Sequence, residues 1–335
     1  MIVSKPRRAV KGRVPFDDRR VGLLPPDTDR SKSMSRLPIP RLLKTPLVLL
    51  WNQIYWRGLR ALAGAGAVVR GRVERCSACG QIRPMLYYRR IIPNRLVELW
   101  GLTPRQAAAL AHKESDFCSA CGAKQRARRI ASVLLELYPV GAPQSPTRAA
   151  SLREWTRDPA IRRLRVAEIN RVDGLHEALR ELPNFEASDY VPGAAPGASA
   201  DGVRNEDLCR LTYPDASFEL IVTSETLEHV PDLRKALAQI HRALAPGGRH
   251  VFTAPVAPWE PKTFPRARSR EDGEVEHLTA PIHHPAGDTG YLVFTELGTD
   301  FPEILRDAGF ETSVYFGPVR DDDLAQVYVC RKPLP

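Results

Sequence analysis

Two short cysteine pairs carry the clearest metal-binding chemistry in this sequence of 335 residues. The pentapeptide Cys-Ser-Ala-Cys-Gly occupies positions 76–80 and again positions 118–122. Four thiolates can surround one Zn²⁺ tetrahedrally, and the glycine after each pair permits the turn that directs backbone amides toward sulfur. We therefore predict a structural zinc site, closed to any catalytic water, whose ligands are Cys76, Cys79, Cys118 and Cys121.

A redox Cys-x-x-Cys motif is the alternative interpretation of these cysteines. Such a motif normally occurs once, at the start of a helix that follows a strand, whereas this pattern is duplicated. His112 could also replace one thiolate, although a histidine on an exposed helix face is the simpler interpretation. Cys209 and Cys330 are interpreted as small apolar residues. Reduced thiols in this arrangement indicate a cytoplasmic protein.

A second stretch whose residues could take part in chemistry contains two adjacent motifs. Residues 215–232 read D-A-S-F-E-L-I-V-T-S-E-T-L-E-H-V-P-D, and residues 236–252 read A-L-A-Q-I-H-R-A-L-A-P-G-G-R-H-V-F. These motifs resemble the fourth strand and its loop, then the helix, L-x-P-G-G turn and fifth strand, of class I S-adenosylmethionine-dependent methyltransferases (methyltransferase type 11). A polar strand end at the carboxyl edge of a parallel sheet is also where doubly wound folds bind ligands.

The loop expected to bind the cofactor departs from that family's pattern. The family reads E/D-x-G-x-G-x-G after its first strand, whereas residues 168–174 read E-I-N-R-V-D-G. Glycines let the backbone approach the cofactor, so Asn170 and Val172 predict a looser or differently shaped loop. The resemblance also implies one carboxylate near the ribose and one near the adenine, where each accepts hydrogen bonds. The predicted cofactor-binding residues are Glu168, Gly174, Asp189 (ribose), Asp207 (adenine), Leu208 and Glu225.

Methyl transfer from a sulfonium is an in-line displacement, so the enzyme aligns the reactants and removes a proton if the nucleophile is a hydroxyl. A base that titrates near neutrality suits this task. The candidates are His229, which follows the fourth strand, and His283 or His284, within an insertion at 255–295 expected to cover the acceptor. Glu225 and Glu228 are the carboxylate alternatives.

The late histidine segment belongs to a wider polar cluster. Residues 283–288, His-His-Pro-Ala-Gly-Asp, resemble the Y-H-G-D-P text of a subset of these enzymes that also carry a tetracysteine knuckle and a degenerate glycine loop. The resemblance implies a small-molecule or glycan-like acceptor. Together with Glu276, His277 and Asp288, the two histidines could also bind a divalent metal, although their spacing matches no ligand motif.

Positive charge is concentrated near the start of the chain. Residues 1–72 hold 16 Lys and Arg against 4 Asp, a net +12, so the remainder of a chain whose total is +10 carries −2. We predict a disordered basic arm over 1–40 and an amphipathic helical segment over 41–72. The stretch 41–69 could contact a membrane surface, but a helix packed on its own protein is the preferred interpretation. The nearly neutral remainder disfavours a nucleic-acid partner.

The elements that must position these residues follow from alternating apolar runs and helical patterns. Strand-like runs lie at 164–169, 185–188, 218–223 and 249–253, with helical patterns at 125–138, 176–182 and 233–244. This β-α-β alternation predicts an α/β fold with a Rossmann-like, doubly wound, mainly parallel sheet. The predicted organisation is a zinc-ribbon-like tetracysteine module at 73–128 and a class I methyltransferase domain at 129–335.

The function predicted from the sequence is S-adenosylmethionine-dependent O-methylation of a small molecule or a sugar or glycan precursor. A noncatalytic binding or scaffold protein is an alternative, because the missing glycines could mark lost cofactor affinity. An RNA methyltransferase guided by the zinc module and basic arm is a further alternative. It ranks lower because the charge lies in the arm and the knuckles lack interleaved basic and aromatic residues.

Overall fold

The computed structural model describes residues 68–88, 92, 97–98, 101–142, 144–200, 203–270, 272–284, 290–317 and 324–335. The predicted basic arm and residues 41–67 of the predicted helical segment lie outside these ranges. The last residues of that segment, 68–72, belong to a strand instead, because their backbone pairs with a neighbouring strand. None of the described helices is long and apolar enough to cross a membrane.

One eight-stranded sheet with the order β16-β17-β9-β8-β4-β5-β7-β6 forms the centre of the fold. The run from β7 through β5, β4 and β8 to β9 is parallel, whereas β17 is antiparallel to both of its neighbours and β6 is antiparallel to β7. The predicted Rossmann-like, mainly parallel sheet is confirmed. The strands are β4 (Val166–Ile169), β5 (Phe185–Asp189), β6 (Ser199–Ala200), β7 (Val203–Asn205), β8 (Phe218–Ser224), β9 (Leu244–Thr253), β16 (Glu311–Tyr315) and β17 (Val327–Arg331).

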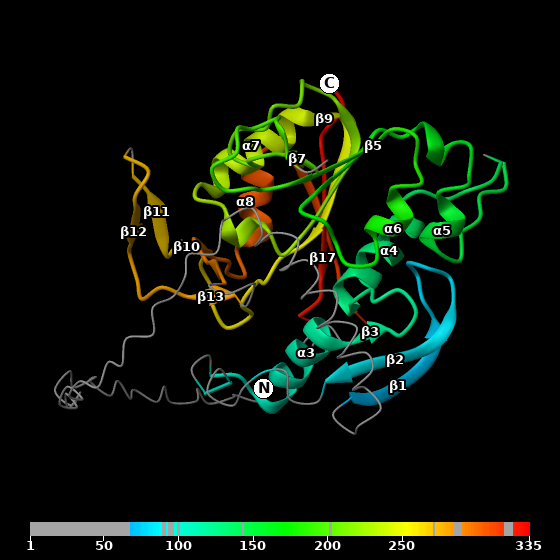
Figure 1. The fold of residues 1–335 in the computed structure, drawn as a ribbon, viewed down its shortest axis with the longest axis horizontal. Coiled ribbons are helices and arrows are strands. Elements are labelled where there is room, and N and C mark those ends of the chain that lie inside the picture. The colour runs from blue at the N-terminus through cyan, green and yellow to red at the C-terminus, as the bar shows by residue number, and fades with distance from the viewer. Residues whose placement is uncertain are drawn as a thin grey trace, which may run out of the picture. The chain divides into compact units, whose positions relative to one another are not determined.

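Helices cover both faces of this sheet, with α4 (Gln125–Leu137) on one side and α7 (Leu233–Ala243) and α8 (Phe301–Asp307) on the other (Figure 1). Alternate residues of one strand point to opposite faces. Val222 of β8 therefore packs in the core beneath α4, while Ile221 packs in the core beneath α7. Burial on both faces explains the unbroken apolar runs that predicted these strands. The remaining short helices are α5 (Leu152–Trp155), η2 (Ile161–Arg163), α6 (His176–Leu179) and η3 (Leu227–His229).

The tetracysteine module is a three-stranded antiparallel sheet of β1 (Val68–Arg75), β2 (Ile82–Tyr88) and β3 (Phe117–Cys118), joined by helix α3 (Pro104–Ser115). Helix α3 begins with a capping box, in which the side chains of Thr103 and Gln106 each accept a backbone N–H of the other. Pro104 occupies the first helical turn, where its missing N–H costs nothing. Helix α4 starts three residues after the second knuckle and runs into the main core. The module and the large sheet therefore share one helix as their connection.

The insertion after β9 folds into three small antiparallel pairs. They are β10 (Phe264–Pro265) with β15 (Thr295–Glu296), β11 (Ala267–Ser269) with β12 (Val275–His277), and β13 (His283–His284) with β14 (Tyr291–Leu292). The backbone N–H of Phe294 donates to the carbonyl oxygen of Glu228 in η3 at 2.8 Å. This bond anchors the insertion beside the loop that follows β8.

Candidate functional site

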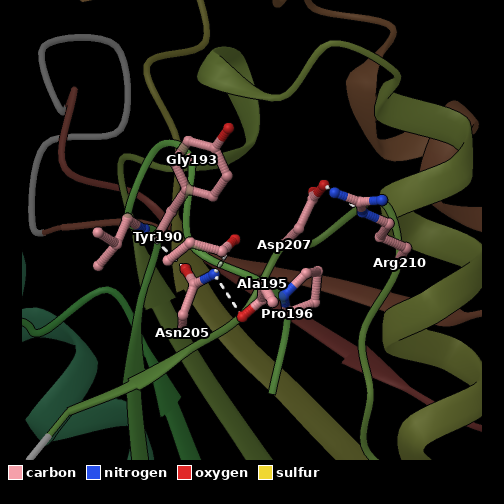
Figure 2. A pocket seen from close by; sticks show the side chains of 9 residues that line it. Tyr190, Gly193, Ala195, Pro196, Asn205, Asp207 and Arg210 are labelled. Carbon is pink, nitrogen blue, oxygen red and sulfur yellow. Dashed lines mark hydrogen bonds and ion pairs between the residues drawn. The ribbon is translucent and has the colours of Figure 1, made fainter. Parts of the chain in front are cut away.

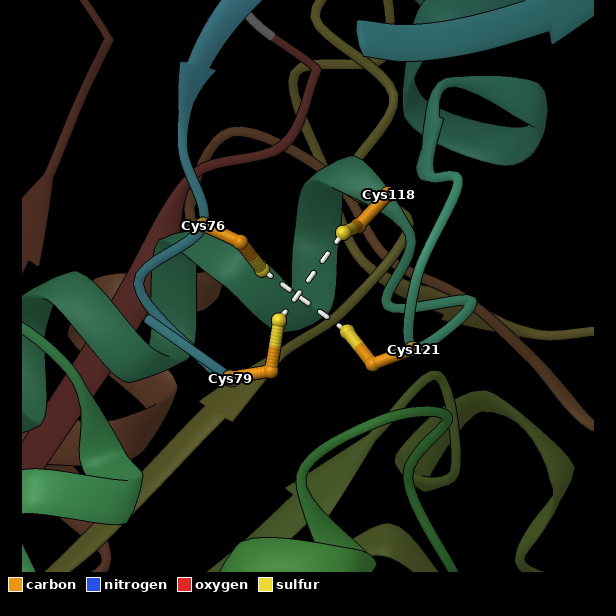
Figure 3. A group of neighbouring side chains, drawn as sticks. All are labelled: Cys76, Cys79, Cys118 and Cys121. Atoms are coloured by element: carbon orange, nitrogen blue, oxygen red, sulfur yellow. Dashed lines mark hydrogen bonds between the residues drawn. The ribbon is translucent and has the colours of Figure 1, made fainter. Parts of the chain in front are cut away.

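The four cysteines of the two knuckles converge on one point, with their side chains directed at one another (Figure 3). The Sγ atoms of Cys76 and Cys121 are 3.7 Å apart, and those of Cys79 and Cys118 are 3.9 Å apart. A Zn–S bond of about 2.3 Å implies a tetrahedron whose sulfur–sulfur edge is about 3.8 Å. These two separations therefore match the edge of such a tetrahedron, and all four sulfurs lie within 4.8 Å of one another.

The turns around these sulfurs have the geometry that their glycines were predicted to allow. Gly80 and Gly122 adopt φ angles of 78° and 75°, in the left-handed region. The backbone N–H of Ala120 points at the Sγ of Cys118 at 3.4 Å. His112 is not part of the cluster, because its Nδ1 lies 3.6 Å from a carboxylate oxygen of Asp116.

Contacts among the sulfurs shift the pKa values of these thiols in opposite directions. They lower the pKa of the Cys118 thiol and raise the pKa of the Cys76 and Cys121 thiols. The cause is that S–H groups stabilise one thiolate, while that first negative charge opposes a second. A central dication would stabilise all four thiolates together.

The loop after β4 is held in place by the residue predicted to start the cofactor site. Glu168 is fully buried, and its carboxylate accepts the backbone N–H of Val172 at 3.0 Å and Nδ1 of His176 at 2.6 Å. Asn170 has a φ of 59°, a left-handed conformation that asparagine tolerates better than most residues. Its side chain also accepts the N–H of Tyr190 at 3.0 Å. Asparagine thus adopts a glycine-like φ angle at this position.

The second cysteine knuckle packs directly against the same loop. Gly174 has a φ of 75°, and a Cβ atom there would lie 2.4 Å from the Cβ of Ala123, just beyond the knuckle. Beside it, Nζ of Lys124 lies 3.3 Å from a carboxylate oxygen of Asp173. A small cavity of about 190 Å³ borders this junction, and its lining residues are Arg126, Ala127, Arg171, Val172, Asp173 and Ser224. The start of α4, directly after the second knuckle, therefore lines one side of this cavity.

The two carboxylates predicted for the ribose and adenine lie at successive strand ends. Asp189, the last residue of β5, accepts the backbone N–H of Arg171 at 3.1 Å and forms an ion pair with its guanidinium at 2.8 Å. Asp207 lies beyond β7 and forms an ion pair with Arg210 at 3.3 Å. It lines a cavity of about 330 Å³ together with Tyr190 and Asn205 (Figure 2). Leu208, the neighbouring predicted contact, is buried in the core beneath α7.

A buried lysine that the sequence did not single out reaches the end of β8. Lys113 of α3 is only 2% exposed, and its Nζ lies 2.6 Å from Oε2 of Glu225, which is 13% exposed. Glu225 has a φ of 50°, and its Oε1 is buried without a hydrogen-bond partner. Nothing in the spacing of α3 marks Lys113, because its partner lies 112 residues away in the sequence.

Three predicted acid–base residues meet at the turn after β8. Oε1 of Glu228 lies 3.3 Å from Nε2 of His229 and 3.5 Å from Nδ1 of His284. Burial alone would raise the pKa of Glu228, but the neighbouring imidazoles of His284 and His229 lower it, and the lowering is the larger effect. Burial likewise lowers the pKa of His284, but Glu228 raises it above the ordinary histidine value. We call Glu228, His229 and His284 the β8-loop triad.

The structure separates the remaining members of the predicted histidine cluster from this triad. His283 is exposed on β13. Glu276 forms an ion pair with Arg268 across the β11–β12 pair at 2.9 Å, and His277 is exposed on the same strand. Asp288 lies outside the described residues. The structure therefore brings together the three residues of the triad, and not the wider cluster, next to the sheet edge.

A comparison with known protein families matches the part of the chain that holds β4, β5 and β8. Residues 164–252 match the family model described as a methyltransferase domain. A demethylmenaquinone methyltransferase of Deinococcus radiodurans is 30% identical over 153 residues, which cover 41% of this chain and 62% of that protein. The 27-O-demethylrifamycin SV methyltransferase of Amycolatopsis mediterranei is 46% identical over 43 residues, covering 13% of this chain and 16% of that protein. The chain thus spans less than two thirds of each relative.

An S-adenosylmethionine-dependent methyltransferase from Mesorhizobium loti is one of the solved structures to which this chain is similar. It is 20% identical, and the alignment covers 50% of this chain and 91% of that one with a TM-score of 0.33.

Proposed function

We propose that this chain, whose residues 164–252 match the family model described as a methyltransferase domain, is an S-adenosylmethionine-dependent methyltransferase acting on a hydroxyl group. One observation supports this proposal above all. The loops that follow β4, β5 and β8 in the matched segment bring polar side chains to a single edge of the sheet. Strands β5 and β8 flank β4 on opposite sides, so the chain reverses its direction of winding at β4. Ligands of doubly wound sheets bind in the crevice at such a switch point.

The cofactor would lie along the carboxyl ends of β4, β5 and β8. Gly174 lets the loop after β4 pack closely against Ala123, and Asp189 can accept hydrogen bonds from the ribose hydroxyls in addition to those from Arg171. Asp207 borders the larger cavity, which suits the adenine. When bound, S-adenosylmethionine supplies a methyl group on a sulfonium.

The acceptor side would be formed by the β8-loop triad and the insertion after β9. The imidazole of His284 is held at 3.5 Å from the carboxylate of Glu228, which orients the ring and stabilises positive charge on it. This pair can help remove the proton of an acceptor hydroxyl. The relatives' names denote small-molecule methyltransferases, and one denotes an O-linked methyl group. We therefore extend the proposal to a small molecule or glycan precursor as acceptor.

We further propose that the tetracysteine module holds a structural Zn²⁺. The sulfur–sulfur distances of 3.7 and 3.9 Å support this assignment, as does the closed set of four thiols. Cys118 would join the ion to Ala123 through only a few residues of chain, and Ala123 packs against Gly174. The ion would in this way hold one wall of the cofactor site rigid.

Calorimetric titration of the full chain with S-adenosylmethionine tests the proposed function. The D189A variant should bind the cofactor at least about tenfold more weakly, because hydrogen bonds to a charged group contribute about 1.5–3 kcal/mol. The matched control is D215A, because Asp215 precedes β8 at the opposite edge and is exposed. Absence of binding by the wild type at millimolar cofactor would favour the noncatalytic alternative. Equal effects of D189A and D215A would refute the assignment of the edge.

A further inference from the structure

The β8-loop triad joins two segments that are far apart in the sequence. Glu228 and His229 lie in the 3₁₀ turn η3, and His284 comes from β13, more than 50 residues later. Nδ1 of His229 donates to the carbonyl oxygen of Leu292 in β14 at 2.8 Å. Together with the bond between Phe294 and Glu228, this contact fixes the insertion against the turn. One ligand-type atom from each triad residue lies within 4.8 Å of the others.

The carboxylate at the centre of the triad lacks a hydrogen-bond partner. Glu228 is 1% exposed, and neither Oε1 nor Oε2 has a hydrogen bond to any described residue. A buried charge of this kind is costly unless it is paired in good geometry or coordinates a metal. Both carboxylate oxygens of Glu228 are therefore left to interact with a cation.

The tautomer of His229 makes this position suitable for a cation. Because a carbonyl oxygen can only accept, Nδ1 must carry the proton that is donated to Leu292. In the neutral ring, Nε2 then presents its lone pair to Oε1 of Glu228 at 3.3 Å. Histidines that bind metals are oriented in the same way, with the other ring nitrogen donating to a carbonyl or carboxylate.

We propose that Glu228, His229 and His284 bind a divalent transition metal ion, separate from the ion of the tetracysteine module. Ligands at about 2.0–2.2 Å in tetrahedral geometry stand about 3.4 Å apart. The observed separations from Oε1 of Glu228 are 3.3 Å to His229 and 3.5 Å to His284. Two imidazoles with one carboxylate suit ions such as Zn²⁺, Co²⁺ or Fe²⁺, and this set leaves coordination positions open.

The open positions give the ion a part in the reaction, a step that rests on the proposed function. His284 is 31% exposed, so the triad is accessible from solvent on its side. An acceptor hydroxyl that binds the ion would lose its proton more readily, and the proton would pass to bulk water. The oxygen lone pair would then form the O–CH₃ bond while the S–CH₃ bond breaks and S-adenosylhomocysteine leaves. The proposal thus favours acceptors whose hydroxyl can also act as a metal ligand.

Metal analysis of the full chain tests the site without reference to activity. After dialysis against Co²⁺, we expect two ions per wild-type chain, one with thiolate charge-transfer bands and one with only the weaker bands of nitrogen and oxygen ligands. The H284N and E228Q variants should keep the first signal and lose the second, with Co²⁺ affinity reduced more than about 100-fold. Loss of an outer partner alone costs 10–100-fold. H283N, which changes the exposed neighbour on the same strand, should retain both signals.

A single ion per wild-type chain, bound only by thiolates, would overturn the proposal, and so would an H284N variant that binds Co²⁺ as the wild type does. Circular dichroism shows whether H284N is folded. If E228Q fails to fold, the result for folded H284N alone decides the test. Cofactor calorimetry is independent of these measurements. Two bound ions without cofactor affinity would support the metal site and refute the proposed methyltransferase function. Cofactor binding by a chain with only one bound ion would support the methyltransferase function and refute the metal site.

Discussion

The ion pair between Lys113 and Glu225 gives the sharpest test of how the tetracysteine module is joined to the large sheet. Its two atoms are 2.6 Å apart, Lys113 is 2% exposed, and Glu225 is 13% exposed with a second oxygen that lacks a partner. Replacing one member of a buried pair typically costs 3–5 kcal/mol, because the remaining charge stays buried and uncompensated. We expect K113M to lower the free energy of unfolding by about 3 kcal/mol, the lower end of that range, since Glu225 retains some contact with water.

Urea unfolding followed by circular dichroism measures this change for the full chain. The double variant K113M/E225Q should recover part of the loss, because no buried charge then remains without a partner. The matched control is K124M, whose partner Asp173 is 56% exposed, and which should cost at most about 1 kcal/mol. A K113M variant within 1 kcal/mol of the wild type would refute the reasoning, as would strictly additive effects of K113M and E225Q.

Three further outcomes follow from the same geometry. G174A should destabilise the chain by about 1–3 kcal/mol more than G193A, because both positions have positive φ but only Gly174 abuts Ala123; equal losses in thermal or urea unfolding would contradict this. C121S should abolish one tightly bound zinc by elemental analysis, and full zinc content in the variant would exclude the tetracysteine site. His250 is fully buried and its pKa is lowered to about 3 by burial, so between pH 6.5 and 3 the unfolded chain binds more protons and stability falls as the pH falls. The contribution is about 1.4 kcal/mol per pH unit; an H250L variant should show a correspondingly shallower acid slope, and an unchanged slope would show that His250 is not responsible.

The local patterns of the sequence were sufficient to predict the main elements. The apolar run at 218–223 predicts β8 and the periodic residues at 233–244 predict α7, because burial on a sheet or a helix face leaves a period that can be read along the chain. The repeated Cys-x-x-Cys-Gly knuckles predicted the convergence of four sulfurs for a different reason. Each knuckle is a local turn, and one ion-sized centre is the simplest arrangement that satisfies both.

Contacts between distant segments were decided only by the tertiary structure. The sequence proposed His229, His283 and His284 as equivalent bases, but β13 directs only His284 to Glu228 and leaves His283 exposed. Alternation along a short strand separates neighbours in this way, and the register of β13 is set by its pairing with β14 rather than by its own two residues. Likewise, Ala123 meets Gly174 and Lys113 meets Glu225 because α4 carries the module onto the core beside β9 and β17. Periodicity shows which face of an element is buried, but which partner covers that face depends on how all the elements pack together.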